Sequence, residues 1–289
     1  MTTLTSCTGA VEFGSGRPTL LINSELQIIG QDARVLQELR DGRFDYIMGL
    51  AQAGIEKGVR TVDIVIDHPE LDETVLLPPL ASRLNEELGV FISLDTRNSA
   101  ALEPALSAIQ PAKGLVNSVT AEKALLERIL PIVRKYAAAV VGMPIGETHG
   151  LPHTVEGRLA EARVILAATQ EAGIPRDDVV LDGICLSAAV EPGSFQVALE
   201  TVRGLRQEFG VTTLLGISNA GYGLPEPTIV EQAYLLAAIP WGLDAALIDP
   251  ATLGLVESVL AMDYMTGNDP TGKRYLNNYR AKKQKGNHG

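Results

Sequence analysis

The stretch FISLDTRNSAALEPALSAIQPAKGLVN, residues 91–117, decides the fold. It begins with a short apolar run that ends in Asp95, continues through a helical pattern near 98–109, and closes with a second apolar run that ends in Asn117. Short apolar runs bounded by polar residues are typical of buried strands. Two such strands joined by a helix predict a parallel pair.

The same unit recurs along the chain. Strands are expected at 19–23, 61–66, 90–94, 114–117, 137–143, 178–182, 212–217 and 244–248. Helical patterns follow at 32–57 (broken near Asp41), 72–88, 98–109, 121–136, 155–172, 194–209, 227–239 and 251–265. This alternation predicts an α/β protein, a (β/α)₈ barrel. The alternative is an open doubly wound sheet, but its Gly-rich first turn is replaced here by NSELQIIGQD.

The composition shows no break that would divide the barrel, so we expect a single domain. Residues 1–18 are interpreted as an N-terminal extension that closes the bottom of the barrel, and residues 19–266 as the barrel itself. Residues 267–289 are interpreted as a polar, basic C-terminal tail, frayed and solvated.

Charge and cysteine content exclude several classes of function. The net charge of −11 argues against nucleic-acid binding, and charged residues interrupt every apolar run before it could span a bilayer. Cys7 and Cys185 form no CxxC, and the N-terminus does not read as a secretory signal, so we expect a cytoplasmic protein. The four histidines show no ligand spacing, and no metal site is expected.

Polar residues end most of the expected strands. They are Asn23, Asp67, Asp95, Asn117, Asp182, Asn219 and Asp249. In a barrel of this kind the carboxyl ends of the strands face the active site. A carboxylate accepts two parallel N–H bonds, and an amide both donates and accepts, so a ring of such groups favours a flat heterocycle over a phosphate. Each residue alone serves equally well as a helix cap.

Several phrases carry a family resemblance. They are INSEL (22–26), SLDTRN (93–98), VNSVT (116–120), VLDG (180–183), GISNAG (216–221) and GLDAALID (242–249). From about residue 20 to 261 the chain resembles the pterin-binding methyltransferases, barrel enzymes related to dihydropteroate synthase. It looks most similar to methyltetrahydrofolate:corrinoid protein methyltransferases, including the methyltransferase component of anaerobic O-demethylase systems.

The resemblance implies a role for each matching residue. Asp95 and Asn117 match residues that hydrogen-bond the pterin, and Asp182 matches the carboxylate that holds its amino-pyrimidinone edge. Asn219 matches the catalytic amide near N5, the atom that carries the methyl group.

The remaining contacts implied by the resemblance are smaller or less regular. Gly216 and Ser218 match positions that approach the pterin face, and Leu247 matches an apolar contact on the last strand. After the second strand the family often has an asparagine, and here Asp67 or Asp63 takes that place.

The implied activity is methyl transfer between the cobalamin (corrinoid) of a partner protein and N5 of tetrahydrofolate, forming methyltetrahydrofolate in a demethylation pathway. The resemblance also implies a homodimer. A non-catalytic module that binds pterin or docks the corrinoid protein is one alternative. A dihydropteroate synthase-like transferase is another, although that enzyme's Ser-Arg-Lys phrase after the seventh strand is missing. An aldolase would need a lysine at a strand end, which this chain lacks.

Overall fold

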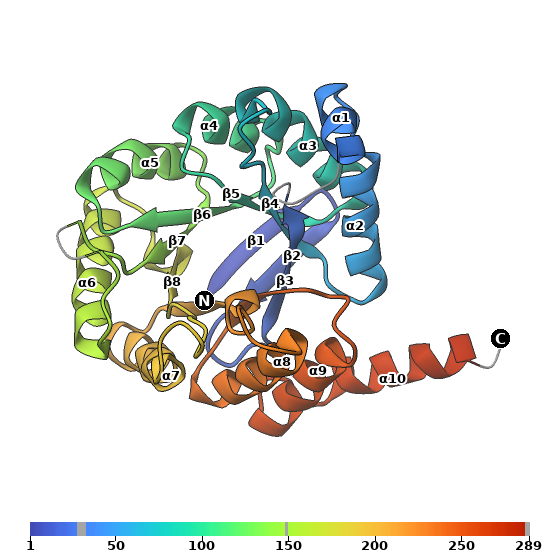
Figure 1. The fold of residues 1–289 in the computed structure, drawn as a ribbon, viewed down its shortest axis with the longest axis vertical. Helices are drawn as coiled ribbons and strands as arrows, with labels where there is room; N and C mark the ends of the chain where they lie inside the picture. The colour runs from blue at the N-terminus through green and yellow to red at the C-terminus, as the bar shows by residue number, and fades with distance from the viewer. Residues whose placement is uncertain (28–32, 148–149, 287–289) are drawn as a thin grey trace.

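Eight parallel strands close into a barrel in the computed structural model, which describes residues 1–27, 33–147 and 150–286 (Figure 1). Around the barrel the strands follow the order β10-β3-β4-β5-β6-β7-β8-β9. Their bounds are β3 Leu20–Gln27, β4 Thr61–Val65, β5 Phe91–Asp95, β6 Leu115–Thr120, β7 Ala139–Met143, β8 Val179–Asp182, β9 Thr212–Gly216 and β10 Ala245–Ile248. The predicted (β/α)₈ barrel is therefore confirmed.

Helices surround the barrel (Figure 1). They are α1 Ala33–Arg40, α2 Asp45–Glu56, α3 Glu73–Leu88, α4 Ser99–Ala108, α5 Lys123–Lys135, α6 Val155–Glu171, α7 Ser194–Gly204, α8 Pro227–Ala238, α9 Leu255–Thr266 and α10 Lys273–Gly286. Short helical turns η1 Arg176–Asp178, η2 Leu205–Phe209, η3 Ile217–Asn219 and η4 Ile239–Trp241 connect them. The pattern at 32–57 forms two helices, α1 and α2, and its predicted start at residue 32 lies outside the described residues.

Polar side chains fix where several outer helices begin. Asp72 accepts a hydrogen bond from the Thr74 backbone N–H at 2.9 Å at the start of α3, and Asn98 accepts one from Ala100 at 3.1 Å at the start of α4. These bonds satisfy N–H groups that have no partner within the helix. Because the caps follow the strand ends by several residues, Asp95 is not needed as the cap of α4.

An N-terminal hairpin lies against the amino-terminal end of the barrel. Its strands, β1 Thr2–Ser6 and β2 Gly9–Phe13, place Leu4 and Phe13 in one fully buried cluster with inward residues of the barrel strands. The Thr5 backbone N–H donates to the carbonyl of Lys113 at 3.1 Å. Burial of each of these two side chains contributes about 2 kcal/mol. Apolar side chains therefore fill this end of the barrel interior.

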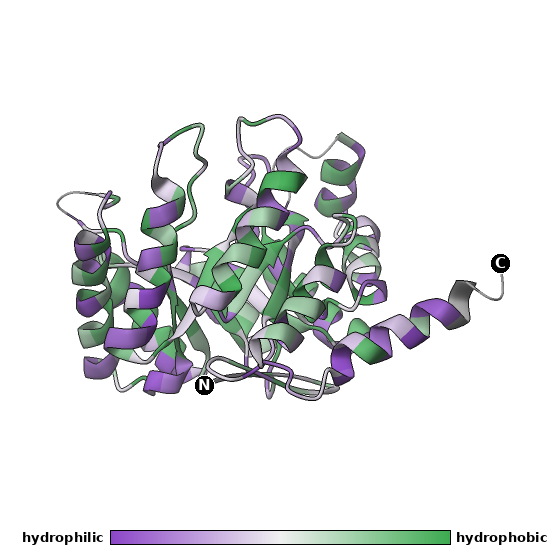
Figure 2. Ribbon diagram, turned by 90° about the horizontal axis from the view of Figure 1, so that it is seen from below, coloured by the Kyte–Doolittle hydropathy of each residue, from purple (hydrophilic) through white to green (hydrophobic). Residues whose placement is uncertain are grey.

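Residues Lys273–Gly286 form a helix, α10, where the sequence predicted a frayed tail. α10 projects from the barrel beside α9 and is largely hydrophilic (Figures 1 and 2). Ion pairs of Arg274 with Asp263, at 3.4 Å, and of Lys282 with Glu257 attach it to α9. The prediction of a frayed tail was wrong. Helices are predicted from apolar periodicity, and α10 is held by ion pairs instead, so its sequence lacks that pattern. Within the described ranges, no helix combines the length and hydrophobicity needed to cross a membrane.

We expect Asp263→Ala to lower the free energy of unfolding by about 2–3 kcal/mol. The buried Asp263 carboxylate accepts bonds from the Thr19 backbone N–H at 3.0 Å and the Thr19 hydroxyl at 2.7 Å, just before β3. Its removal leaves those donors without a partner. Urea unfolding checks this, with Glu87→Ala as the control because Glu87 pairs with Arg83 on the exposed face of α3. Equal losses in the two variants would contradict this role of Asp263.

Candidate functional site

A buried polar cluster occupies the barrel interior toward the carboxyl ends of β4, β5 and β6. The strand register places Asp63 beside Ser93. The Asn117 side-chain amide donates to the two Asp63 carboxylate oxygens at 3.1 and 3.3 Å, and the Ser93 hydroxyl donates to the first of them. Burial raises the pKa of Asp63, while these donors act in the opposite direction. Asp63 therefore fixes the orientation of Asn117.

Asp95 lies next to this cluster, at the end of β5 and in register with Asn117. Burial, followed by the charge of Asp63, raises the pKa of Asp95 to about 7, and Arg97 opposes the shift. Near neutral pH the Asp95 carboxyl group can therefore donate a hydrogen bond or accept one.

Asp67 lies apart from the cluster. It is exposed after the end of β4 and lines a cavity of about 620 Å³ together with other residues of segment 66–73 and Asn98. Of the two candidates after the second strand, Asp63 is the one that contacts Asn117. Asp67 is placed where it acts on Asp95 through charge.

Asp182 ends β8 and is nearly buried. One of its oxygens accepts the Ile184 backbone N–H at 2.7 Å, and within the described part of the chain the other accepts no hydrogen bond. Burial raises the pKa of Asp182 to about 6, while the Ile184 bond and the charge of Arg158 oppose the shift. Asp182 is therefore largely ionised at neutral pH, with one oxygen available to a ligand.

Arg158 is a residue that sequence reasoning missed. It comes from α6 and is fully buried. Its Nη1 donates to the carbonyls of Gly183 and Ile184 at 2.8 and 2.9 Å, and its Nε donates to the carbonyl of Pro152 at 3.1 Å. These bonds hold the loop after β8, in which Ile184 adopts a φ of 59°, a conformation that costs energy for a branched side chain. Arg158 thus positions the segment that orients Asp182.

Asn219 and Ser218 lie in η3, directly after β9, and both side chains are exposed. The Ser218 hydroxyl is hydrogen-bonded to that of Ser24 at 3.2 Å, which links η3 to β3. A Cβ atom at Gly216 would lie 3.1 Å from the Asn219 amide nitrogen. Glycine at this position therefore leaves space for the Asn219 amide.

The last predicted contact, Leu247, is half-buried on β10 and in register with Gly216. It packs against the cluster that fills the barrel interior. The structure thus brings Gly216, Ser218, Asn219 and Leu247 together at neighbouring strand ends.

Two other strand-end residues have structural partners. Asn23 is buried, where its side chain accepts from the Glu25 backbone N–H at 3.0 Å and donates to the Leu50 carbonyl at 3.4 Å. Asp249 accepts from the Ala251 backbone N–H at 2.7 Å, as a turn or capping residue does. The side chains of these two residues therefore bond to backbone groups of the protein.

Carboxylates dominate the electrostatics of this end of the barrel. Burial and the charges of Asp249 and Glu231 raise the pKa of the half-buried Glu25. Burial also raises the pKa of Glu73, near Asp67. An acidic rim attracts N–H donors and repels phosphate. The arrangement suits a neutral or amine-bearing heterocycle with a donor-rich edge.

A sequence model of the family described as "Pterin binding enzyme" matches residues 33–247, which include every site residue discussed above except Asn23, Ser24, Glu25 and Asp249. The chain belongs to this family.

Two characterised relatives have similar sequences. Methylcorrinoid:tetrahydrofolate methyltransferase of Eubacterium limosum is 23% identical over 248 residues, 84% of this chain and 89% of that protein. Methionine synthase of Mycobacterium tuberculosis is 25% identical over 214 residues, 70% of this chain but only 18% of that longer protein.

Solved structures of dihydropteroate synthases share the fold. The enzyme from Yersinia pestis bound to a pterine–sulfa conjugate superposes with a TM-score of 0.66 at 18% identity, covering 91% of this chain and 98% of that one. The enzyme from Vibrio fischeri gives 0.64 at 18% identity, with 90% and 98% covered. At this level of identity the likeness concerns the fold alone.

We expect Asp182→Asn to stabilise the ligand-free protein at pH 8 by about 2 kcal/mol, because ionising a buried carboxyl with a raised pKa costs free energy. The cost is absent below the unfolded-state pKa near 4 and complete above about 6. The difference between variant and wild type should therefore shrink as the pH falls from 8 to 4. Thermal or urea unfolding across this range measures it, and a pH-independent difference would contradict the ionisation of Asp182.

We expect Arg158→Gln to raise the pKa of Asp182 above its wild-type value of about 6, because the positive charge that opposes burial is lost. Stability should fall by about 2–4 kcal/mol, since buried carbonyls lose their donors. Carbon-13 NMR titration of labelled aspartate reports the pKa directly. Arg158→Lys keeps the charge, so it should lose stability with a smaller change in pKa. A pKa unchanged in Arg158→Gln would leave Arg158 with a structural role only.

Proposed function

We propose that this protein is a methyltransferase that moves a methyl group between a corrinoid carried by a partner protein and N5 of tetrahydrofolate. The observation that carries the proposal is the pair of acceptor groups at the carboxyl ends of the strands. Asp182 lies on one side, and Asp95 with the Asn117–Asp63 pair lies on the other. The similarity to the Eubacterium limosum methyltransferase over most of both chains supports it.

The Asp182 carboxylate suits the amino-pyrimidinone edge of a pterin. That edge presents two parallel N–H donors, which the free Asp182 oxygen and the second lone pair of the oxygen bonded to the Ile184 N–H can accept. Asp95 and Asn117 would then face the other side of the bicyclic ring. Because Asp95 has a pKa of about 7, it can adapt to either a donor or an acceptor on the pterin.

Asn219 is the residue we assign to N5. In the transfer toward folate, the N5 lone pair forms the new bond to the methyl carbon. The cobalt–carbon bond breaks, its electron pair stays on cobalt, and the N5 proton is released. The Asn219 amide can accept from a protonated N5 or donate to a neutral one. Its contribution is the polarity and orientation around N5 rather than acid or base strength.

An apolar segment of the rim beside Asn219 supports docking of a corrinoid protein. Tyr222 is 72% exposed and Val190 is 65% exposed. The Ser187 hydroxyl donates to the Tyr222 carbonyl at 2.6 Å, which ties the loops after β8 and β9 together. Fixed, exposed apolar side chains are typical of protein-binding surfaces.

A dihydropteroate synthase-like activity is the second candidate, favoured by the shared fold. The acidic rim argues against it, because carboxylates such as Glu25, Glu73 and Glu231 would repel a pyrophosphate leaving group. An assay for pteroate formation separates the two candidates.

We expect the purified protein to transfer methyl groups from free methylcobalamin to tetrahydrofolate. The loss of the methylcobalamin absorbance measures this transfer. Asn219→Ala should lower kcat about 10²-fold, within the range for loss of one group that stabilises a transition state. Gln196→Ala, which removes an exposed amide on α7, is the matched control and should leave the rate unchanged.

The binding of tetrahydrofolate by calorimetry completes the test. Tight binding without transfer, even with an added corrinoid protein, would favour a non-catalytic pterin-binding module. An absence of both binding and transfer would overturn the assignment.

A further inference from the structure

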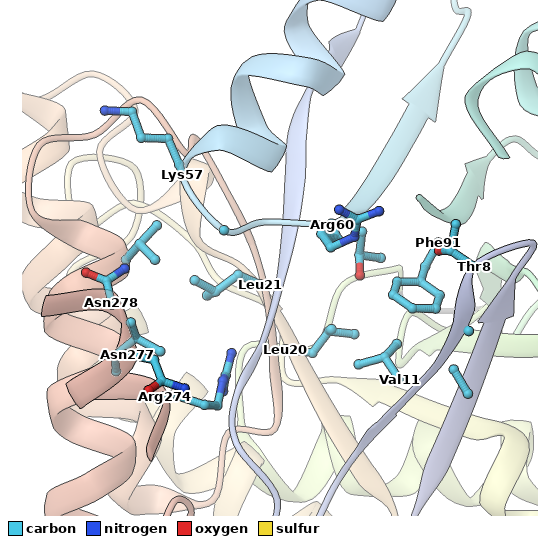
Figure 3. Close-up of a pocket in the computed structure, with 16 residues that line it drawn as sticks. Thr8, Val11, Leu20, Leu21, Lys57, Arg60, Phe91, Arg274, Asn277 and Asn278 are labelled. Carbon is cyan, nitrogen blue, oxygen red and sulfur yellow. The ribbon is translucent and has the colours of Figure 1, made fainter. Parts of the chain in front are cut away.

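A second cavity opens on the opposite end of the barrel from the candidate site. It has a volume of about 610 Å³, within the usual range for small-molecule sites. Its walls come from the hairpin tip at residues 8–11, the first residues of β3, β4 and β5, and helices α9 and α10 (Figure 3). None of these residues belongs to the site described above.

The floor of this cavity is apolar. Leu20 and Leu21 of β3 lie between the hairpin and α10, with Phe91 and Val11 on the hairpin side (Figure 3). Leu260 of α9 adds to the floor. These side chains keep small exposed areas that a ligand with an apolar body would cover.

All the described charged residues that line the cavity are basic. The charged residues among the sixteen that line the cavity are Lys57, Arg60 and Arg274, and no described acidic residue joins them there. This contrasts with the chain as a whole, in which 35 acidic residues outnumber 24 basic ones. Asn277 and Asn278 supply amides on the α10 wall. The cavity therefore favours an anionic group within an otherwise acidic protein.

The two arginines keep donors free for such a group. Arg60 donates to the backbone carbonyls of Leu88 and Gly89 at 3.1 and 3.4 Å, and among the described residues no carboxylate pairs with it. Arg274 contacts Asp263 through Nη1 alone, at 3.4 Å, and a guanidinium has five N–H donors. The two guanidinium groups stand on different sides of Leu20 and Leu21, whereas the Lys57 amine points away from them (Figure 3).

We propose that this cavity binds a small amphipathic anion, with its apolar body on Leu20, Leu21 and Phe91 and its carboxylate, sulfonate or phosphate group held by Arg60 or Arg274. Such a ligand would join the hairpin to α10, which otherwise projects from the barrel. The inference is independent of the activity proposed for the opposite end.

The test uses 8-anilinonaphthalene-1-sulfonate as the probe, because it combines aromatic rings with one sulfonate and fluoresces when bound. We expect saturable binding of one probe per chain, weakened about tenfold in at least one of Arg60→Gln and Arg274→Gln, which identifies the arginine that holds the sulfonate. Lys273→Gln is the matched control, since it removes one positive charge from the same turn of α10 outside the cavity. N-phenyl-1-naphthylamine, which lacks the sulfonate, should bind more weakly than the probe and should not discriminate among these variants.

A further variant guards against disturbance of α10 by the loss of Arg274. Ala10→Trp places a large side chain from the exposed hairpin tip into the cavity and leaves all three basic residues in place. It should abolish probe binding without lowering the melting temperature. Equal probe affinity in wild type, both arginine variants and Ala10→Trp would overturn the proposal.

Hydrogen–deuterium exchange then locates the probe. We expect protection at residues 8–11, 57–61 and 273–278, unaffected by saturating tetrahydrofolate. Protection confined to the loops at the carboxyl ends of the strands would contradict the proposed location. Competition by octanoate and by octyl phosphate identifies the preferred anionic group, and failure of both to displace the probe would overturn the assignment to an amphipathic anion.

Discussion

Closure of the eight-stranded parallel barrel is the constraint on which the rest of the structure depends. Because all the strands run in one direction, their carboxyl ends meet at one rim, and the register decides which side chains become neighbours there. Asp63 meets Ser93, and Asp95 meets Asn117, although each pair is separated by a helix in the sequence. At the opposite end the hairpin supplies Leu4 and Phe13 to the apolar cluster of the barrel interior.

Ionisation of the buried carboxyl groups at this rim costs free energy, and neighbouring hydrogen-bond donors and charges reduce that cost. Ser93 and Asn117 donate to Asp63, while the Ile184 backbone and the charge of Arg158 act on Asp182. The offset is partial, since the pKa values of Asp95 and Asp182 remain near 7 and 6. A ligand that donates hydrogen bonds to these carboxylates would stabilise their ionised forms further. Carboxyl groups with shifted pKa values are common at functional sites for this reason.

The two ends of the molecule differ in charge. Acidic groups gather where the strands end, and the cavity beside the hairpin is lined by basic groups alone among the charged residues described there. The first arrangement suits a donor-rich heterocycle, and the second suits an anion. Sites of opposite preference can coexist because the packed barrel interior separates them.

The sequence by itself determined the order of strands and helices, because apolar runs and amphipathic patterns depend only on neighbouring residues. It also placed Asp95, Asn117, Asp182 and Asn219 at strand ends. The tertiary structure alone separated inward groups such as Asn117 from Asn23, which bonds to the backbone of β3 and of α2. It likewise revealed buried Arg158 and helical α10, because burial and charge pairing between distant segments leave no local pattern in the chain.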